Sequence, residues 1–179
     1  MFTRDNAVMM LVDVQGQLAQ LMYRKEALFN SLEIMIKGMK ALGVPIIWLE
    51  QIPAKLGATT ECLAVLMEDQ KPIEKHSFSC CAEPSFMQAL NTCGRREILL
   101  TGIETHICVC QTGIDLIDQG CQVQVVADCV SSRTPENRQI GLDRLAGAGA
   151  QITSVEMAFF ELMKTARCDA FKQVVQLIK

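Results

Sequence analysis

Short apolar runs alternate with amphipathic stretches along the whole chain, and this alternation limits the fold more than any other feature. The apolar runs predict six strands. They cover residues 7–14, 44–49, 72–75, 97–101, 123–127 and 150–153. The stretches between them have helical spacing, and several end at a glycine or begin near a proline. Helices are therefore predicted at 26–42, 61–67, 83–92, 107–119 and 135–147, with one or two more near the C-terminus.

Strands that alternate with helices favour right-handed βαβ units and a parallel sheet with helices on both faces. We therefore predict an α/β fold, a three-layer doubly wound sheet of six mainly parallel strands in the order 3-2-1-4-5-6. The sequence has no repeat, low-complexity tract or linker, so residues 1–179 are expected to form one domain. Sheets of this kind bind ligands at the carboxyl ends of their strands, here between the first and fourth strands.

Cys108 follows the apolar run around Leu99 and the turn at Gly102, and a helical pattern begins beside it. Free N–H groups and the positive end of the helix dipole favour a thiolate at such a position. A cysteine on a sharp strand-to-helix turn is therefore a candidate nucleophile. The alternative is that a small apolar cysteine only packs the turn.

Asp13 and Lys75 end the first and third predicted strands. A carboxylate at the end of a buried strand is costly unless it is paired or functional, although Asp13 could also cap the next turn. Lys75 alone carries no signal, because most lysines are solvated surface charges. The predicted strand order brings Asp13 to the same crevice as Cys108.

With these residues in place, the chain resembles the isochorismatase-like hydrolases, often called cysteine hydrolases, over nearly its full length. The similarity lies in MMLVDVQGQ around Asp13, IEKHSFS around Lys75 and GIETHICV around Cys108. The resemblance implies an Asp-Lys-Cys triad in which Asp13 is the general base, Lys75 stabilises the ion pair and Cys108 forms a thioester. It also implies a cis peptide at Ile103-Glu104 that aims backbone N–H groups at an oxyanion. The segments 48–57 and 131–133 look closest to the isochorismatase-domain-containing branch.

Two departures from the family bear on the substrate. The histidines with which nicotinamidases bind a metal after the second strand are absent, and true isochorismatases lack the nucleophilic cysteine. We therefore expect no metal or other cofactor, and a small-molecule substrate with an amide, carbamoyl or related C–N bond. Glu50 and His76 are pocket candidates from their strand-end positions, and each could equally be a structural hydrogen-bonding residue.

Composition limits the partners and the cell compartment. The formal charge of -3 gives no basic surface for nucleic acid, and no apolar stretch approaches a membrane span. Nine cysteines without an export signal predict reduced thiols and a cytoplasmic location. A structural zinc site that uses Cys80-Cys81 or Cys108 and Cys110 is the alternative, although neither pair has C-x-x-C spacing and only His76 and His106 could add imidazole ligands.

The C-terminal segment 155–163 has more apolar residues than one helix face buries, which predicts a homo-oligomer, a dimer or a tetramer. The alternative is that Phe159 and Phe160 both pack within their own subunit. Two further functions stay open at this point. The chain could be a catalytically weak family member that acts as an interaction protein, or a thiol redox sensor that uses Cys108 and Cys110.

Overall fold

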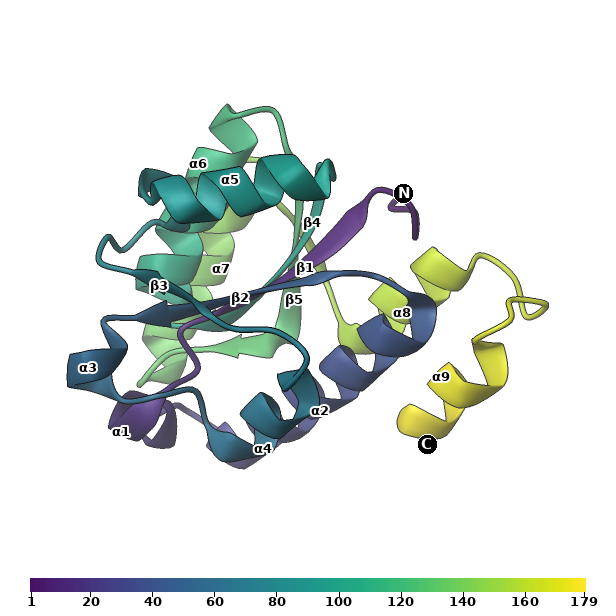
Figure 1. Ribbon diagram of the computed structural model, residues 1–179, viewed down its shortest axis with the longest axis horizontal. Coiled ribbons are helices and arrows are strands. Elements are labelled where there is room, and N and C mark those ends of the chain that lie inside the picture. Colours follow the sequence, from purple (N-terminus) through teal and green to yellow (C-terminus); the bar gives the residue numbers. More distant parts are fainter.

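All six strands of the sheet run parallel, in the order β3-β2-β1-β4-β5-β6 (Figure 1). The computed structural model describes residues 1–179. The strands are β1 (Ala7–Val12), β2 (Ile46–Gln51), β3 (Ile73–Lys75), β4 (Glu97–Ile103), β5 (Gln122–Ser131) and β6 (Gln151–Thr153). This confirms the predicted fold class and strand order.

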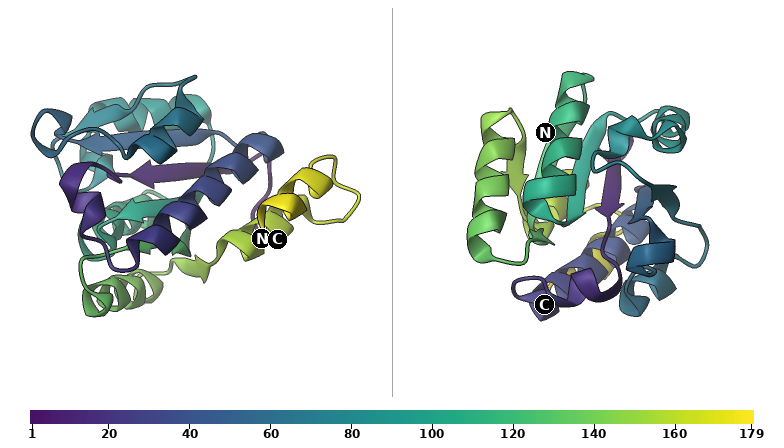
Figure 2. Two further views of the ribbon diagram at one scale, coloured as in Figure 1. Left: turned by 90° about the horizontal axis from the view of Figure 1, so that it is seen from below. Right: turned by 90° about the vertical axis from the view of Figure 1, so that its left-hand side faces the viewer.

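Helices cover the sheet on both faces, which gives the three predicted layers (Figures 1 and 2). One face carries α5 (Pro84–Cys93), α6 (Cys110–Asp118) and α7 (Pro135–Gly147). The other carries α2 (Lys25–Leu42), α4 (Glu61–Ala64), α8 (Val155–Met163) and α9 (Phe171–Leu177). Two short helices, α1 (Gly16–Gln20) and α3 (Pro53–Leu56), follow β1 and β2 and were not predicted. None of the helices is both long and apolar enough to cross a membrane.

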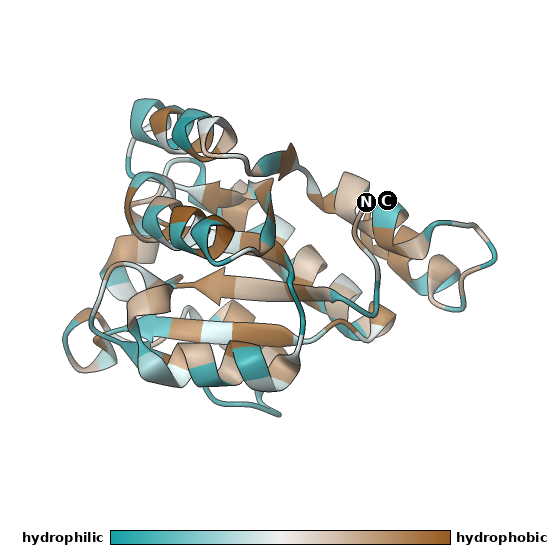
Figure 3. Cartoon of the chain, turned by 90° about the horizontal axis from the view of Figure 1, so that it is seen from above, coloured by the Kyte–Doolittle hydropathy of each residue, from teal (hydrophilic) through white to brown (hydrophobic).

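The central strand β1 is buried on both sides, as its unbroken apolar sequence predicts. Met9 and Leu11 pack with α2 and α8, whereas Met10 and Val12 face the helices of the opposite layer. Each fully buried side chain of this size contributes about 1.5–3 kcal/mol. The strands are accordingly the most continuously hydrophobic part of the chain (Figure 3).

Strands β1 and β4 come unusually close at their carboxyl ends. Gly102 has φ 118°, and a Cβ atom there would lie 2.1 Å from the carbonyl oxygen of Val12. Only glycine allows both the backbone conformation and this approach. The close approach brings the residue after β1, which is Asp13, next to the turn that leads from β4 to Cys108.

Strand β2 begins and ends two residues later than predicted, so Glu50 and Gln51 lie inside it. Gln51 pairs in register with Lys75 of β3. The polar end of β2 did not look like a strand because nothing in the local sequence shows which partners satisfy its side chains. Those partners come from β1, β3 and the loop after β2.

Candidate active site

Asp13 and Lys75 form a buried ion pair at the carboxyl edge of the sheet. The Lys75 Nζ lies 2.7 Å from Asp13 Oδ2, and the two side chains are 0% and 3% exposed. Lys75 is the last residue of β3, and Asp13 follows β1 with a left-handed backbone (φ 56°). Asp tolerates this conformation better than most residues. The sheet thus brings together two charges that are far apart in sequence.

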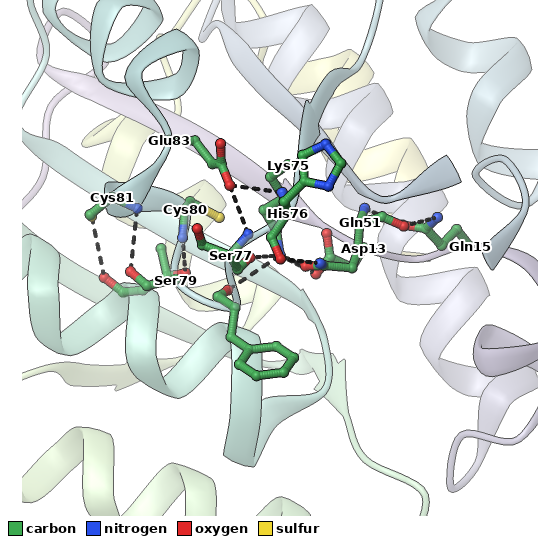
Figure 4. A network of polar contacts seen from close by, with 12 residues as sticks. Asp13, Gln15, Gln51, Lys75, His76, Ser77, Ser79, Cys80, Cys81 and Glu83 are labelled. Carbon is green, nitrogen blue, oxygen red and sulfur yellow. Dashed lines mark hydrogen bonds and ion pairs between the residues drawn. The ribbon is translucent and has the colours of Figure 1, made fainter. Parts of the chain in front are cut away.

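The Lys75 ammonium has no hydrogen left for another partner. Besides Asp13, it donates to Gln51 Oε1 and to the carbonyl oxygens of Ser77 and Phe78, at 3.1 and 3.2 Å (Figure 4). An ammonium has three hydrogens, so these acceptors use all of them. Burial, the largest single effect, lowers the pKa of Lys75, but Asp13 together with smaller contributions from Cys108 and Cys80 outweighs it, and the net pKa is raised. Lys75 therefore stays charged.

Gln15 and Gln51 hold this edge of the sheet together. The Gln51 N–H donates to Gln15 Oε1 at 2.6 Å, and Gln15 Nε2 donates to the carbonyl oxygens of Gln51 and Gly57 at 3.0 and 2.6 Å. Gln51 Nε2 donates to the His76 carbonyl oxygen at 2.7 Å. Neither residue was predicted from the sequence. The signal available was a polar residue at a strand end that must be buried and therefore needs partners.

Asp13 is the incompletely satisfied member of the network. Its Oδ1 is buried and has no hydrogen-bond partner in the protein. Burial raises the pKa of Asp13, and the Lys75 ammonium only partly reverses this. Cys108 lies close enough for its thiol and the Asp13 carboxyl to shift each other's pKa. A buried polar atom without a partner is rare and often marks a functional group.

Cys108 lies in a π-helical turn, η3 (Thr105–Val109), that continues directly into α6. The N–H groups of Ile107 and Val109 both donate to the Glu104 carbonyl oxygen. Helix α7 packs tightly on the outside of this turn, where a Cβ on Gly141 would lie 2.7 Å from the carbonyl carbon of Thr105. π-Helical turns are rare and are frequent at functional sites.

The Cys108 thiol is protonated in the free protein, contrary to the expectation of a thiolate. Burial raises the pKa of Cys108 to about 12, and the Asp13 carboxylate adds to that increase. Lys75 acts in the opposite direction but does not outweigh them. The helix end and the lysine, which favour a thiolate, are visible in the sequence, whereas the desolvation of the sulfur is not.

Cys108 opens onto a cavity of about 170 Å³. Its apolar walls are formed by Leu18, Leu56, Phe78, Ile103 and Ile107. Its polar lining is formed by Asp13, Gln15, Gln51, Glu104 and Cys108. The Ile103-Glu104 peptide bond at the cavity is cis. The Glu104 carboxylate accepts from the backbone N–H and the Nε of Arg133, each at 3.1 Å.

Glu50 and His76 do not line this cavity, in contrast to their proposed place in the pocket. Glu50 Oε1 accepts from the N–H and the Oγ1 of Thr59, both at 2.7 Å, and so fixes the loop after β2. The His76 side chain is exposed, and its backbone N–H donates to Glu83 at 2.7 Å (Figure 4). A strand-end position alone did not show which way these side chains point.

The residues offer no cluster of three or more His, Cys, Asp or Glu side chains that could hold a metal ion. Cys80 and Cys81 form a short 3₁₀ turn, η2 (Cys80–Ala82), in which the Cys80 N–H donates to Thr112 Oγ1 at 3.0 Å. All nine cysteines are free thiols. The Cys80-Cys81 pair therefore ties the loop after β3 to α6.

The sequence model of the isochorismatase domain matches residues 7–157, which include the whole sheet and all of the site residues above. The chain belongs to the isochorismatase family. It is 37% identical to the secreted isochorismatase effector Isc1 of Phytophthora sojae, over 97% of this chain and 85% of that protein. Other relatives carry names such as isochorismatase domain-containing protein. The protein is therefore a hydrolase of this family, as predicted, with a substrate that these names do not give.

Solved structures agree with the family assignment. The MAR1 ribonuclease structure from Caenorhabditis elegans superposes with a TM-score of 0.92 at 31% identity, over 99% of this chain and 91% of that one. The YcaC gene product of Escherichia coli, described as an octameric hydrolase of unknown specificity, also gives 0.92, at 21% identity over 98% and 89% of the two chains. At 21% identity, the similarity to YcaC shows a shared fold only.

Proposed function

We propose that residues 1–179 act as one metal-independent cysteine hydrolase domain that cleaves an amide, carbamoyl or related C–N bond of a small molecule. Asp13, Lys75 and Cys108 are its triad. One observation supports this most. The buried Asp13 carboxylate, whose Oδ1 has no geometric hydrogen-bond partner, lies beside the Cys108 thiol at the cavity and next to an ammonium whose hydrogens are all in use.

The first step moves a proton within the site. Asp13 takes the proton from Cys108 Sγ, and the sulfur attacks the substrate carbonyl carbon to form a tetrahedral adduct. The proton transfer removes the negative charge from Asp13, and the attack of the sulfur places that charge on the substrate oxygen, so the site as a whole keeps its charge. The thiol pKa of about 12 means that the thiolate forms only as it attacks, rather than being stored in the free protein.

The next steps return the proton and regenerate the thiol. Protonated Asp13 gives its proton to the leaving nitrogen, the C–N bond breaks and the amine leaves a thioester on Cys108. A water molecule then loses a proton to Asp13 and attacks the thioester carbon. The acid leaves, and the Cys108 sulfur recovers its proton from Asp13.

The substrate oxygen gains negative charge in both tetrahedral adducts. We assign its stabilisation to backbone N–H groups of the turn from Ile103 and Glu104 to Cys108. Fixed donors aimed at a developing oxyanion typically lower the barrier by about 3–4 kcal/mol each. The salt bridge from Arg133 to Glu104 and the packing of α7 on η3 support the rigidity that this role needs.

A trapping experiment tests the proposal. The protein is mixed with a panel of small amides and carbamoyl compounds, ammonia release is followed, and acid-quenched samples are analysed by intact-mass spectrometry. We expect turnover and an acyl adduct on Cys108, both lost in Cys108→Ala. Cys110→Ala is the matched control, since Cys110 is buried two residues further on and does not line the cavity. Turnover that survives in Cys108→Ala would refute the mechanism.

The two alternative functions make other predictions in the same experiment. An interaction protein would give neither ammonia nor adduct with any compound. A redox sensor needs a reactive thiolate, and the raised pKa of Cys108 disfavours that chemistry. We therefore rank hydrolysis first.

We also propose a homo-oligomeric assembly, a dimer or a tetramer, and a cytoplasmic location. Exposed apolar side chains on α8 and the octameric YcaC hydrolase support assembly. Nine free thiols support a reducing compartment, whereas the Phytophthora sojae relative is named a secreted effector. Fractionation of cells that produce the tagged protein tests the location.

A further inference from the structure

The polar groups of the cavity are almost all committed to the protein. Both ends of the Gln15 side chain bind the backbone, and both ends of Gln51 bind Lys75 and the His76 carbonyl oxygen. The Glu104 oxygens bind Arg133. Besides one N–H of Gln51 Nε2 and the backbone N–H groups assigned to the oxyanion, the unused capacity belongs to Asp13 Oδ1 and the Cys108 thiol, the proposed reacting groups. A ligand therefore finds few polar partners beyond the reaction centre itself.

No positively charged side chain lines the cavity. Lys75 lies beneath it with every hydrogen in use, and Arg133 is engaged by Glu104. A ligand carboxylate would lose its hydration without gaining a cation, and it would face the carboxylates of Asp13 and Glu104. Burying an unpaired charge next to like charges is strongly unfavourable.

The cavity also disfavours a ligand that carries an ammonium group. Asp13 is already paired with Lys75 and Glu104 with Arg133, so each carboxylate that lines the cavity has its cation. The remaining wall consists of Leu18, Leu56 and three further apolar side chains. Apolar walls reward an uncharged ligand in proportion to the apolar area that it buries.

The volume adds a limit on size. About 170 Å³ is well below the ~300–1,000 Å³ of pockets that enclose drug-sized ligands. The part of the ligand that is enclosed is therefore small, with the carbonyl carbon at Cys108 and a short group against the apolar wall.

We propose that this cavity selects small, uncharged carboxamides with an apolar acyl group and rejects amides that carry a carboxylate or an ammonium. The inference rests on the proposed function only in naming an amide as the substrate. The selection by ligand charge is a property of the cavity itself and can be measured without turnover.

The first test uses two alkylating agents of similar shape, neutral iodoacetamide and anionic iodoacetate. Rates of modification at Cys108 are obtained by peptide mass spectrometry and divided by the rates with free glutathione. We expect iodoacetamide to be favoured by about tenfold or more after this correction. Equal corrected rates, or a preference for iodoacetate, would overturn the proposal.

Leu56→Lys supplies the missing cation at the mouth of the cavity, where Leu56 is 38% exposed. This variant should raise the corrected iodoacetate rate by about tenfold. Leu21→Lys is the matched control, since Leu21 is 61% exposed and does not line the cavity. At physiological salt, where the screening length is about 8 Å, it should change the ratio by less than about twofold.

The second test compares butyramide, succinamate and β-alaninamide, which are neutral, anionic and cationic amides of similar length. Binding is measured by the thermal unfolding midpoint of Cys108→Ala, and turnover by ammonia release from the wild type. Stabilisation by butyramide alone, without turnover, would support the inference while the proposed function fails. Stabilisation by succinamate or β-alaninamide equal to that by butyramide would refute the inference whatever the turnover, and so would no stabilisation by any of the three.

Discussion

Gln15 and Gln51 join the ends of β1 and β2 through paired contacts between one side chain and the other's backbone. Gln15 accepts from the Gln51 N–H at 2.6 Å and donates to the Gln51 carbonyl at 3.0 Å. This leaves the Gln51 side chain free to accept from the Lys75 ammonium. The position of Lys75, and through it the charge beside Asp13 and Cys108, depends on this pair.

Replacing Gln51 with methionine should therefore impair chemistry more than binding. Loss of an orienting hydrogen bond typically costs about 10–100-fold in activity, so we expect kcat to fall by that range with KM within about threefold. Gln124→Met is the matched control, because Gln124 is buried in β5 and contacts Gln151 and Glu161 away from the cavity. Steady-state kinetics of both variants test this prediction. Equal losses of kcat in Gln51→Met and Gln124→Met would show that Gln51 affects activity only through the stability of the fold.

Asp13 and Lys75 should shift the titration of Cys108 in opposite directions. The Asp13 carboxylate raises the pKa of the Cys108 thiol and the Lys75 ammonium lowers it. Asp13→Asn should therefore move alkylation of Cys108 to lower pH by about one unit or more, and Lys75→Met should move it higher. Hydrolysis should be lost in both variants.

The Asp13→Asn result separates two mechanisms. A thiolate that is merely stored would make this variant more active, whereas a thiol that needs Asp13 as its base makes it inactive. Alkylation rates against pH, with ammonia release in parallel, distinguish them. An unchanged alkylation profile in both variants would remove the electrostatic roles given to these residues.

Buried thiols should make the protein unstable in alkali. Burial raises the pKa of Cys80, Cys108 and Cys129, whereas a thiol in an unfolded chain titrates near about 8.5. Above that pH the unfolded chain loses protons that the folded protein retains, so stability falls as pH rises. Each such thiol should lower the free energy of unfolding by about 1.4 kcal/mol per pH unit.

Urea unfolding at several pH values between about 7 and 10 measures this slope. Cys129→Ala should give a shallower decline than the wild type, although it is less stable at every pH. Val126→Ala removes buried volume without a thiol and should keep the wild-type slope. A flat stability profile in the wild type would contradict the burial of these thiols.

Chelation should leave turnover intact. The residues provide no cluster of metal ligands, and the proposed mechanism activates the thiol and the water through Asp13 alone. Activity is measured after prolonged dialysis against EDTA and again after addition of zinc. Loss on dialysis followed by recovery with zinc would establish a metal-dependent amidase instead.

The sequence was sufficient for the fold because the apolar runs are long enough to specify which strands are buried. Asp13 and Cys108 were selected because carboxyl ends of parallel strands meet at one edge, whereas Lys75 was selected only through the family resemblance. The structure places Lys75 against Asp13, and Asp13 and Cys108 at one cavity. That reasoning fails for Glu50 and His76, which also end strands. The Glu50 carboxylate turns to Thr59 in the loop after β2, and the His76 side chain is exposed while its backbone N–H binds Glu83, none of which strand periodicity describes.

The pKa of Cys108 shows a second limit of sequence reasoning. A nearby lysine and a helix start are visible in the sequence, and both favour a thiolate. The packing of the sheet and helices around the sulfur, which removes water from it, is visible only in three dimensions. Gln15 and Gln51 were missed for the same reason, since a glutamine gives no sign of its partners until the strands are paired.

Assembly through α8 is the remaining prediction. Phe159 packs inside its own subunit, where its ring fills the space next to Gly38 of α2. Phe160 and Met157 instead stay 44% and 60% exposed on the opposite side of α8. Exposed apolar surface of this kind often marks a contact between subunits, so Phe160→Glu should dissociate the oligomer.

Val65→Glu, at a residue that is 50% exposed in η1 (Val65–Met67), is the control and should leave the oligomer intact. Light scattering after size-exclusion chromatography measures both masses. A monomeric wild type at micromolar concentration would refute the assembly, whereas dissociation by Val65→Glu alone would move the interface from α8 to η1.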